Sequence, residues 1–329
     1  MSSSIVIPEQ GSLFPSGHAA LSAQDARSRL ERAIVEAELR LDDEDVYGLS
    51  EFVALVDSVR RAVTPAFWRQ LIGDVIAPHP LRPRLHEEPL TRRAFEKPRG
   101  YAGDAAMIDL IYRRGADVSG LTPLGSRLHE WAVNHSAFRS VQERRDLLAD
   151  LIDQIASERT LPRILSLACG HLREAQQSDA VRDRAVREIV AVDQDRASLA
   201  VVEREQAAHN VTPVHASVRR FLVDPTIYGT FDLAYAAGLY DYLEEPVAIS
   251  LTRAMFESLV PGGMLLVANF APEVREIGYM ECIMDWNLIY RGEANMTRLA
   301  LGIPSDAVES MRISRDSCGN VVYLSIRKR

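Results

Sequence analysis

The sequence has few cysteines and no long apolar run. Its three cysteines, Cys169, Cys282 and Cys318, share neither a metal-binding spacing nor a disulfide framework. No apolar stretch approaches the roughly 20 residues that a membrane-spanning helix needs. The start, MSSSIVIPEQGSLFPSGHAALS, lacks the charged beginning and continuous apolar core of a signal peptide. We therefore expect a cytoplasmic protein without a membrane span, a disulfide or a bound metal.

Excess positive charge is also missing, since 38 Lys and Arg residues stand against 46 Asp and Glu residues, a formal net charge of -8. A nucleic-acid surface needs a basic face that neutralises phosphates, so this composition argues against a nucleic-acid partner. A local basic patch could still exist within the acidic total. At 329 residues the chain is long for one domain, and we expect a main domain with a sizeable extension.

The apolar periodicity divides the chain into three parts. Residues 1–25 are rich in Ser, Gly and Pro without a period, and they predict a loose arm. Residues 26–158 place apolar residues three and four apart, as in SRLERAIVEAELRL, and predict a helical region interrupted by APHPLRPRLHEEP. This region could serve as a lid, as a contact in a homodimer, or as both.

Residues 159–329 alternate short apolar strands with helices, which predicts an α/β domain with a parallel sheet covered on both faces. The end of the chain differs, because SMRISRDSCGNVVYLSIRKR holds two strand-like runs around a Gly-Asn turn. This pattern predicts an antiparallel hairpin at the edge of the sheet.

The stretch ILSLACGHLREA places a single glycine, Gly170, where the first strand of this sheet ends. Ligands of open parallel sheets bind beyond the carboxyl ends of the strands, and a glycine lets the backbone approach them. The second strand ends at Asp193, whose carboxylate can accept hydrogen bonds from a ribose diol. A dinucleotide site would need G-x-G-x-x-G, but Ala168 and Leu172 stand at the other glycine positions. The loop therefore favours a cofactor without a pyrophosphate, such as S-adenosylmethionine (SAM).

An ordered set of motifs resembles the class I SAM-dependent methyltransferases: LSLACG, VAVDQD, VHASVRRFL, FDLAYAAGLYDYL and LVPGGMLLVANF. The resemblance covers roughly residues 160–329. It implies SAM as the cofactor and a Rossmann-like, seven-stranded sheet whose last strand is antiparallel. A narrower resemblance, carried by KPRGYAGD, ILSLACG-x-x-RE, AGLYDYL and DWNLIYR, is to a bacterial group linked to 3-hydroxypalmitic acid methyl ester biosynthesis. It implies methylation of 3-hydroxy fatty acids, although substrates differ among members of that group.

The resemblance to the class I fold implies cofactor contacts at four strand ends. The turn after the first strand faces the methionine part and the acid after the second holds the ribose. Residues after the third flank the adenine, and those after the fourth present the methyl group. Glu174 could accept the cofactor's ammonium and Arg173 could pair with its carboxylate, although a surface ion pair explains both equally well. The predicted cofactor-binding residues are Ala168, Cys169, Gly170, Glu174, Asp193, Gln194, Ser217, Val218, Gly238, Leu239 and Tyr101.

Two further segments are candidates for the acceptor site. RGYAGD places two glycines inside a helical region, where each lowers helix stability by roughly 1 kcal/mol. This pattern predicts a lid or a ligand contact, with a plain inter-helix turn as the alternative. MECIMDWNLIYRGEANM places two aromatic residues and an arginine at helical spacing, so we expect them to share a helix face, in a pocket or in the core. The predicted acceptor-binding residues are Arg99, Asp241, Trp286, Tyr290 and Arg291.

Methyl transfer to an ionised carboxylate requires no general base, whereas a hydroxyl or carbon acceptor would want one. The candidate bases are Tyr240, His171 and His135, although a lone histidine is more often structural. We expect a small-molecule methyltransferase, O-directed, on a fatty-acid-like or natural-product carboxylate or hydroxyl. The alternatives are C- or N-methylation, a non-catalytic SAM-binding module, a methyltransferase acting on a macromolecule, and a nicotinamide oxidoreductase, which the missing glycines disfavour.

Overall fold

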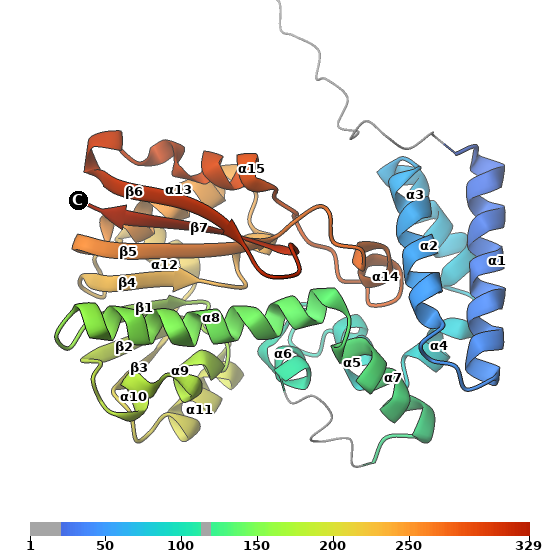
Figure 1. The fold of residues 1–329 in the computed structure, drawn as a ribbon, viewed down its shortest axis with the longest axis horizontal. Helices are drawn as coiled ribbons and strands as arrows, with labels where there is room; N and C mark the ends of the chain where they lie inside the picture. Colours follow the sequence, from blue (N-terminus) through green and yellow to red (C-terminus); the bar gives the residue numbers. More distant parts are fainter. Residues whose placement is uncertain (1–20, 113–119) are drawn as a thin grey trace, which may run out of the picture.

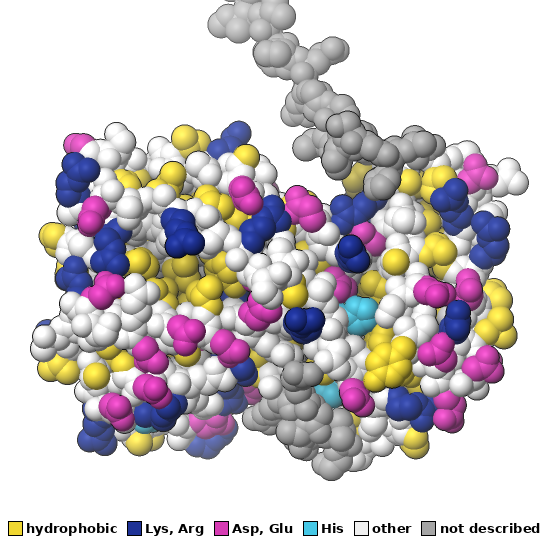
Figure 2. All heavy atoms as spheres, in the orientation of Figure 1, with side chains coloured by type: hydrophobic (Ala, Val, Ile, Leu, Met, Phe, Trp, Pro, Cys, Tyr) yellow, Lys and Arg dark blue, Asp and Glu magenta, His cyan; other side chains and the backbone are white. Residues whose placement is uncertain are grey.

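The computed structural model describes residues 21–112 and 120–329. Residues 1–20 of the predicted arm lie outside the described residues, and the first helix, α1, begins at Ala23. Figure 1 shows a group of helices on one side, a sheet flanked by helices on the other, and the long helix α8 (Ser136–Glu158) extending from the sheet towards the first group. On the face drawn in Figure 2, basic and acidic side chains are interspersed.

The described residues before the sheet form helices and turns. Ser22 caps α1 by accepting a hydrogen bond from the Asp25 backbone. The helices α3, α5 and α7 begin with proline, which fits a first turn because an N–H there has no acceptor within the helix. The predicted interruption contains a short helix, α4. The helices are α1 (Ala23–Asp42), α2 (Leu49–Arg61), α3 (Pro65–Leu71) with a π-helical turn (Ile72–Ile76), α4 (Leu81–Leu85), α5 (Pro89–Glu96), α6 (Ala105–Tyr112), α7 (Pro123–Val133) and α8.

Seven strands form one sheet in the order β3-β2-β1-β4-β5-β7-β6. Neighbouring strands from β3 to β5 are parallel, and β7 runs antiparallel to both β5 and β6. The predicted fold class, a Rossmann-like sheet with an antiparallel last strand behind a helical N-terminal region, is confirmed. The strands are β1 (Arg163–Leu167), β2 (Glu188–Asp193), β3 (Val211–His215), β4 (Phe231–Ala236), β5 (Leu259–Phe270), β6 (Val308–Arg315) and β7 (Val321–Lys328).

Helices cover both faces of this sheet, so its central strands are buried and almost entirely apolar. The long helix α8 lies on one face of the sheet and α13 on the other, as their separate apolar clusters show. The remaining helices are α9 (Arg173–Gln177), α10 (Asp179–Arg182), α11 (Arg196–Glu205), α12 (Val218–Val223), α13 (Glu245–Glu257), α14 (Ile277–Cys282) and α15 (Glu293–Arg298).

The helix α14 connects the sheet to the helical region. Glu281 in α14 accepts hydrogen bonds from the Arg60 guanidinium, at 2.7 and 2.8 Å, and from the Trp68 indole at 2.7 Å. Arg60 is in α2 and Trp68 in α3, so one carboxylate joins three helices that lie far apart in the sequence. This contact fixes the helical region relative to the carboxyl edge of the sheet.

The expectation that Trp286, Tyr290 and Arg291 share one helix face is wrong. The helix α14 ends at Cys282, and residues 285–292 contain no helix. Their backbone is instead satisfied from outside the segment, because the Arg291 N–H donates to the Phe270 carbonyl at 2.9 Å. Outside a helix, residues four or five apart do not share a face, so the spacing does not bring these three side chains together.

Among the described residues, no helix is both long enough and apolar enough to cross a membrane.

Candidate active site

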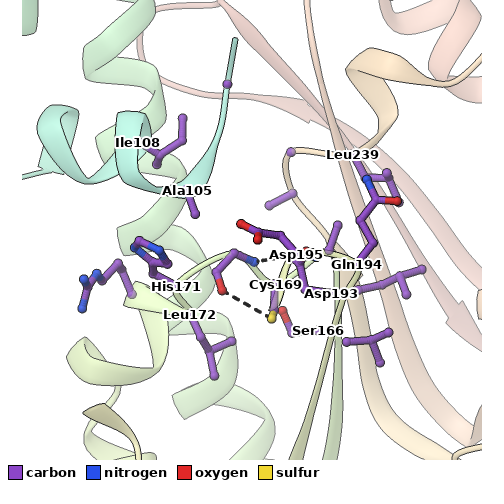
Figure 3. A pocket seen from close by; sticks show the side chains of 18 of the residues that line it. Ala105, Ile108, Ser166, Cys169, His171, Leu172, Asp193, Gln194, Asp195 and Leu239 are labelled. Carbon is purple, nitrogen blue, oxygen red and sulfur yellow. Dashed lines mark hydrogen bonds between the residues drawn. The ribbon is translucent and has the colours of Figure 1, made fainter. Parts of the chain in front are cut away.

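A cavity of about 840 Å³ lies where the carboxyl ends of β1, β2 and β4 meet. One wall consists of the loops after these strands, and the other consists of residues 98–112 with parts of α8. In Figure 3, Cys169 and Asp193 lie on the strand side, and Ala105 and Ile108 of α6 lie opposite. The strand order reverses between β1 and β4, so the cavity occupies the switch point at which open α/β sheets bind ligands. Its volume suits small molecules, whose pockets measure roughly 300–1,000 Å³.

The loop after β1 has an unusual backbone. Ala168, Gly170 and Leu172 have φ angles of 56°, 54° and 52°, in the left-handed region. This conformation costs a residue with a side chain roughly 1–2 kcal/mol, so two of the three positions are strained. A Cβ at position 170 would lie 3.2 Å from the Ala105 Cβ, and glycine there allows α6 to pack closely on the loop. Such strain is typical of ligand-contacting turns.

Asp193, at the end of β2, holds this loop in place. Its Oδ2 accepts the Gly170 N–H at 2.8 Å and its Oδ1 accepts the Asp195 N–H at 2.8 Å. Burial raises the pKa of Asp193, against the lowering effect of these backbone bonds. Each carboxylate oxygen retains a second lone pair, so the side chain can still accept hydrogen bonds from a diol.

Residues 97–104 form a loop across the mouth of the cavity, which we call the lid loop. Arg99 donates from Nη1 to Asp195 Oδ2 at 2.9 Å, which joins the lid loop to the start of α11. Lys97 pairs with Asp285, in the segment after α14. The lid loop is therefore joined to residues 159–329 by two ion pairs.

Aromatic rings meet beneath the lid loop. The Tyr101 ring stands edge-on to the Tyr242 ring, with centroids 6.3 Å apart. The Tyr242 oxygen accepts the Trp286 indole N–H at 2.9 Å, and a Cβ at position 103 would lie 2.5 Å from that oxygen. Gly103 is therefore needed for the close approach of the lid loop. Burial, with a contribution from Asp193, raises the pKa of Tyr101, so its phenol is neutral at pH 7.

The inner end of the cavity holds buried charges. Glu174 of α9 is 8% exposed and its Oε1 accepts the Tyr235 hydroxyl at 2.7 Å. Burial raises the pKa of Glu174. Arg144 of α8 is 6% exposed, and its Nη1 is buried without a hydrogen-bond partner among the described residues. Its guanidinium carbon lies 6.0 Å from the Phe270 ring centroid.

His171 and Arg173 contact α6. The His171 Nδ1 lies 2.9 Å from Asp109 Oδ2, and its Nε2 faces the Arg99 guanidinium at 3.4 Å. Arg173 donates to both Asp109 oxygens, at 2.7 and 2.6 Å, and pairs with Glu205. Burial would raise the pKa of Asp109, but these bonds outweigh it and lower that pKa. Arg173, which the sequence offered to a cofactor carboxylate, is therefore already paired with two carboxylates.

Of the predicted cofactor-binding residues, Ser217 alone does not line the cavity, because it is exposed at the start of α12. The cavity is lined by the predicted residues Ala168, Cys169, Gly170, Glu174, Asp193, Gln194, Val218, Gly238, Leu239 and Tyr101, together with Arg99 and His171.

Tyr240, Asp241 and Arg291 lie in the interior, away from the cavity. The Tyr240 hydroxyl is 3.0 Å from a threonine hydroxyl of α13, on the opposite face of the sheet. Asp241 Oδ1 accepts the Phe270 N–H at 2.7 Å, and Arg291 Nη1 donates to the Tyr240 carbonyl at 2.7 Å. Residues 240–242 form a 3₁₀ turn, whose side chains point in different directions, so Tyr242 rather than Tyr240 reaches the cavity.

Three more predicted residues also lie outside the cavity. His135 immediately precedes α8, and its Nδ1 lies 3.4 Å from Glu276 Oε1. Trp286 is buried, donates its indole N–H to the Tyr242 oxygen and lies beside Gly103. Tyr290 faces the helical region, with the Arg60 guanidinium carbon 5.9 Å from its ring centroid.

Sequence reasoning missed Arg144, Tyr235 and Tyr242 as cavity residues. A signal for Arg144 existed, since it follows Val141 by three residues and precedes Leu148 by four on the buried face of α8. A charged residue at such a position is unusual unless it is paired. Tyr235 carried no comparable signal, because an aromatic residue in an apolar strand is ordinary.

No group of three or more His, Cys, Asp or Glu side chains within the described part of the chain could hold a metal ion. No protein-family model and no curated protein sequence matches the chain.

Several solved structures are similar to this one. A possible exported protein from Bordetella parapertussis has a TM-score of 0.60 at 17% identity, covering 96% of this chain and 99% of that one. The N-methyltransferase NodS from Bradyrhizobium japonicum, solved with S-adenosylhomocysteine, has a TM-score of 0.43 at 14% identity, covering 67% and 97%. Magnesium protoporphyrin IX methyltransferase from Synechocystis, solved with SAM, has a TM-score of 0.41 at 10% identity, covering 67% and 90%. The Bordetella likeness supports the fold, because the other two superpose much less well.

Proposed function

We propose that this protein transfers a methyl group from SAM to a small-molecule acceptor. The observation that carries the proposal is the Asp193 carboxylate, fixed by two backbone N–H groups beside a single-glycine loop at the switch point of the sheet. Ala168 and Leu172 occupy the places where a pyrophosphate-binding loop needs glycine. In this proposal residues 159–329 hold the cofactor, and residues 26–158 supply the lid and the acceptor region.

The residues of the cavity have distinct roles in this proposal. Asp193 accepts hydrogen bonds from the ribose hydroxyls, and the backbone at Gly170 permits close contact with the chain that links ribose and sulfur. When bound, SAM supplies an electrophilic methyl group on a positively charged sulfur. The lid loop, joined to Asp195 through Arg99, excludes water and holds the acceptor in line. Holding two reactants in one orientation can account for much of the acceleration without any acid or base.

We infer that the acceptor is fatty-acid-like and is methylated on a carboxylate oxygen. Apolar and aromatic side chains line the outer cavity, including Ala105, Ile108, Leu239, Tyr101 and Tyr242, and they suit an alkyl chain. A carboxylate is ionised near neutral pH and needs no general base.

The placement of the candidate bases favours the same acceptor. Tyr240 and His135 lie outside the cavity, and His171 has both ring nitrogens engaged, one with Asp109 and the other facing Arg99. None of these three candidates is a free base within the cavity, which suits an acceptor that is already ionised.

The test has two stages. Calorimetric titration with SAM, S-adenosylhomocysteine and NADH should show binding of the two sulfur compounds alone. Methyl-labelled SAM is then offered with 3-hydroxy fatty acids of several chain lengths. Label that alkali releases as methanol identifies a methyl ester. Alkali-stable label would show that the acceptor is a hydroxyl, nitrogen or carbon atom and not a carboxylate. Binding of NADH without either sulfur compound would overturn the methyltransferase proposal.

A further inference from the structure

The His171 imidazole is buried between the lid loop and α6, with 5% of its side chain exposed. Its Nδ1 lies 2.9 Å from Asp109 Oδ2 of α6, and its Nε2 lies 3.4 Å from Arg99 Nη1 of the lid loop. An ionised carboxylate only accepts hydrogen bonds, and a guanidinium only donates them. The two neighbours therefore assign one protonation state, in which Nδ1 carries the ring proton and Nε2 keeps its lone pair towards Arg99. In this arrangement His171 is neutral.

The contact between His171 and Arg99 is the weakest of those that Arg99 Nη1 makes. The same nitrogen donates to Asp195 Oδ2 at 2.9 Å and to Ser198 Oγ at 3.0 Å. The neutral imidazole, at 3.4 Å, therefore adds little attraction. A protonated imidazole would instead present an N–H to a group that cannot accept it, and two positive charges would be in contact. Protonation of His171 thus acts mainly by repulsion.

The carboxylates near His171 are already paired with guanidinium groups. Asp109, which faces the imidazole, accepts two hydrogen bonds from Arg173 of α9. Arg173 also pairs with Glu205 of α11. A proton on His171 would therefore place three cations, those of Arg99, His171 and Arg173, around the Asp109 carboxylate. Of these three, Arg99 belongs to the lid loop, and its displacement would relieve the repulsion.

We propose that His171 is a positioning residue that acts through Arg99. Neutral His171 leaves Arg99 on Asp195, and protonated His171 displaces Arg99 and the lid loop from it. The inference rests on the proposed function, in which the lid loop covers bound SAM. Histidine changes charge between about pH 5 and about pH 8. Because the closed lid loop disfavours the extra proton, a ligand that needs the closed form should bind more weakly and leave faster as the pH falls through this range.

The experiment measures the release of S-adenosylhomocysteine from the full chain by stopped-flow displacement, at several pH values between about 5 and about 8. Burial raises the pKa of Asp193 and of Glu174, so these acids can add to the pH dependence. The informative quantity is therefore the difference between the wild type and His171→Gln, whose amide cannot be protonated. We expect release from the wild type to accelerate roughly 3- to 10-fold more than release from the variant over this range, as for a contact between like charges.

Two further variants test the route and the specificity of the effect. In Arg99→Met a proton on His171 has no guanidinium to repel, so the pH profile should be the same with His171 or with Gln at that position. If His171→Gln alone fails to fold, Arg99→Met still tests the proposal, because it should flatten the wild-type profile to the same extent. His79→Gln removes a histidine that faces Glu38 and does not line the cavity, and it should keep the wild-type profile.

Three results would overturn the inference while leaving the proposed function intact. The first is a wild-type pH profile that matches that of His171→Gln. The second is an Arg99→Met profile as steep as that of the wild type, since His171 would then not act through Arg99. The third is an equally fast release from His171→Gln at every pH together with a lowered thermal midpoint, which would assign His171 a structural role. A chain that binds S-adenosylhomocysteine at no pH would overturn the proposed function as well.

Discussion

The two ends of the cavity hold their charges in opposite ways. At the end where the proposed function places the ribose (the ribose end), both Asp193 oxygens accept backbone hydrogen bonds, and Asp195 is paired with Arg99. At the inner end, which would face the amino-acid part of SAM in the proposed function (the amino-acid end), Arg144 Nη1 has no hydrogen-bond partner among the described residues and Glu174 accepts one side-chain hydrogen bond. The first end is held by hydrogen bonds within the fold, whereas the second keeps a buried guanidinium nitrogen without a partner among the described residues. Substitutions at the ribose end should cost both stability and binding, whereas those at the amino-acid end should cost binding alone.

The largest effect is expected for Asp193→Ala, at the end that the fold completes. The change leaves the backbone N–H groups of Gly170 and Asp195 without an acceptor and removes the proposed ribose contact. We expect SAM affinity to fall by about 100-fold and the free energy of unfolding to fall by about 2 kcal/mol. Calorimetry and urea unfolding measure the two quantities. Asp193→Asn keeps one acceptor oxygen and should lose less of each, and wild-type SAM affinity in Asp193→Ala would refute the assignment.

The next effect concerns Asp241, a carboxylate buried in the interior, away from the cavity. Burial raises its pKa to about 6, although Arg144 and the hydrogen bond from the Phe270 N–H oppose the change. The unfolded chain has a pKa near 3.9 at this residue, so between about pH 4 and about pH 6 the folded state binds more protons. Stability due to this group is therefore present at low pH and is lost as the pH rises through about 6.

Asp241→Asn should remove that loss, because the amide oxygen can still accept the Phe270 N–H. The variant should gain about 3 kcal/mol in free energy of unfolding above pH 6 and nothing near pH 4, as the pKa difference requires. Urea unfolding at the two pH values measures the gain relative to wild type. An equal change at both pH values would mean that Asp241 is not the titrating group.

Glu174→Gln sharpens the comparison at the amino-acid end. The amide oxygen can still accept the Tyr235 hydroxyl, and the buried charge disappears. We expect SAM affinity to fall about 10-fold, as for one charge-assisted hydrogen bond, while 5′-methylthioadenosine binds as before. The free energy of unfolding at neutral pH should stay the same or rise, because burial already disfavours the ionised form. A destabilised variant would place Glu174 with Asp193, among the groups that the fold itself needs.

The sheet and the ribose end were accessible to sequence reasoning because they depend on local signals. Apolar strands ending in Gly170 and Asp193 predict where two strand ends meet, and parallel pairing of β1 with β2 then brings those residues together. The Gly-Asn turn, which is also a local signal, predicted the terminal hairpin.

The amino-acid end was not accessible, since its residues come from packing between distant elements. Arg144 reaches the cavity because α8 lies on the sheet, and no local pattern says which strand end a helix residue will meet. For the DWNLIYR segment the local pattern was misleading. Its helical spacing predicted a shared helix face, but its backbone bonds to Phe270 of β5 and to Asp241 instead of forming a helix. Tertiary bonding decides such short segments more than periodicity does.

The smallest effect is expected for Arg99→Met, which cuts the ion pair between the lid loop and the ribose end. The pair is partly exposed, with side chains 20% and 17% accessible, so its contribution to stability should be slight. Its kinetic role should be larger, because it holds the lid loop shut on one side. We expect SAM to dissociate a few-fold faster, measured by stopped-flow displacement, with little change in unfolding.

Arg253→Met, which removes an exposed pair with Glu257 on α13, should leave the dissociation rate unchanged. If Arg99→Met also leaves it unchanged, residues 97–104 are a fixed wall and ligands enter by another route. The closed ribose end would then reflect the fold alone. If dissociation accelerates, the Arg99–Asp195 ion pair controls the release of the ligand at the ribose end. The two ends of the cavity would then differ in kinetics as well as in charge.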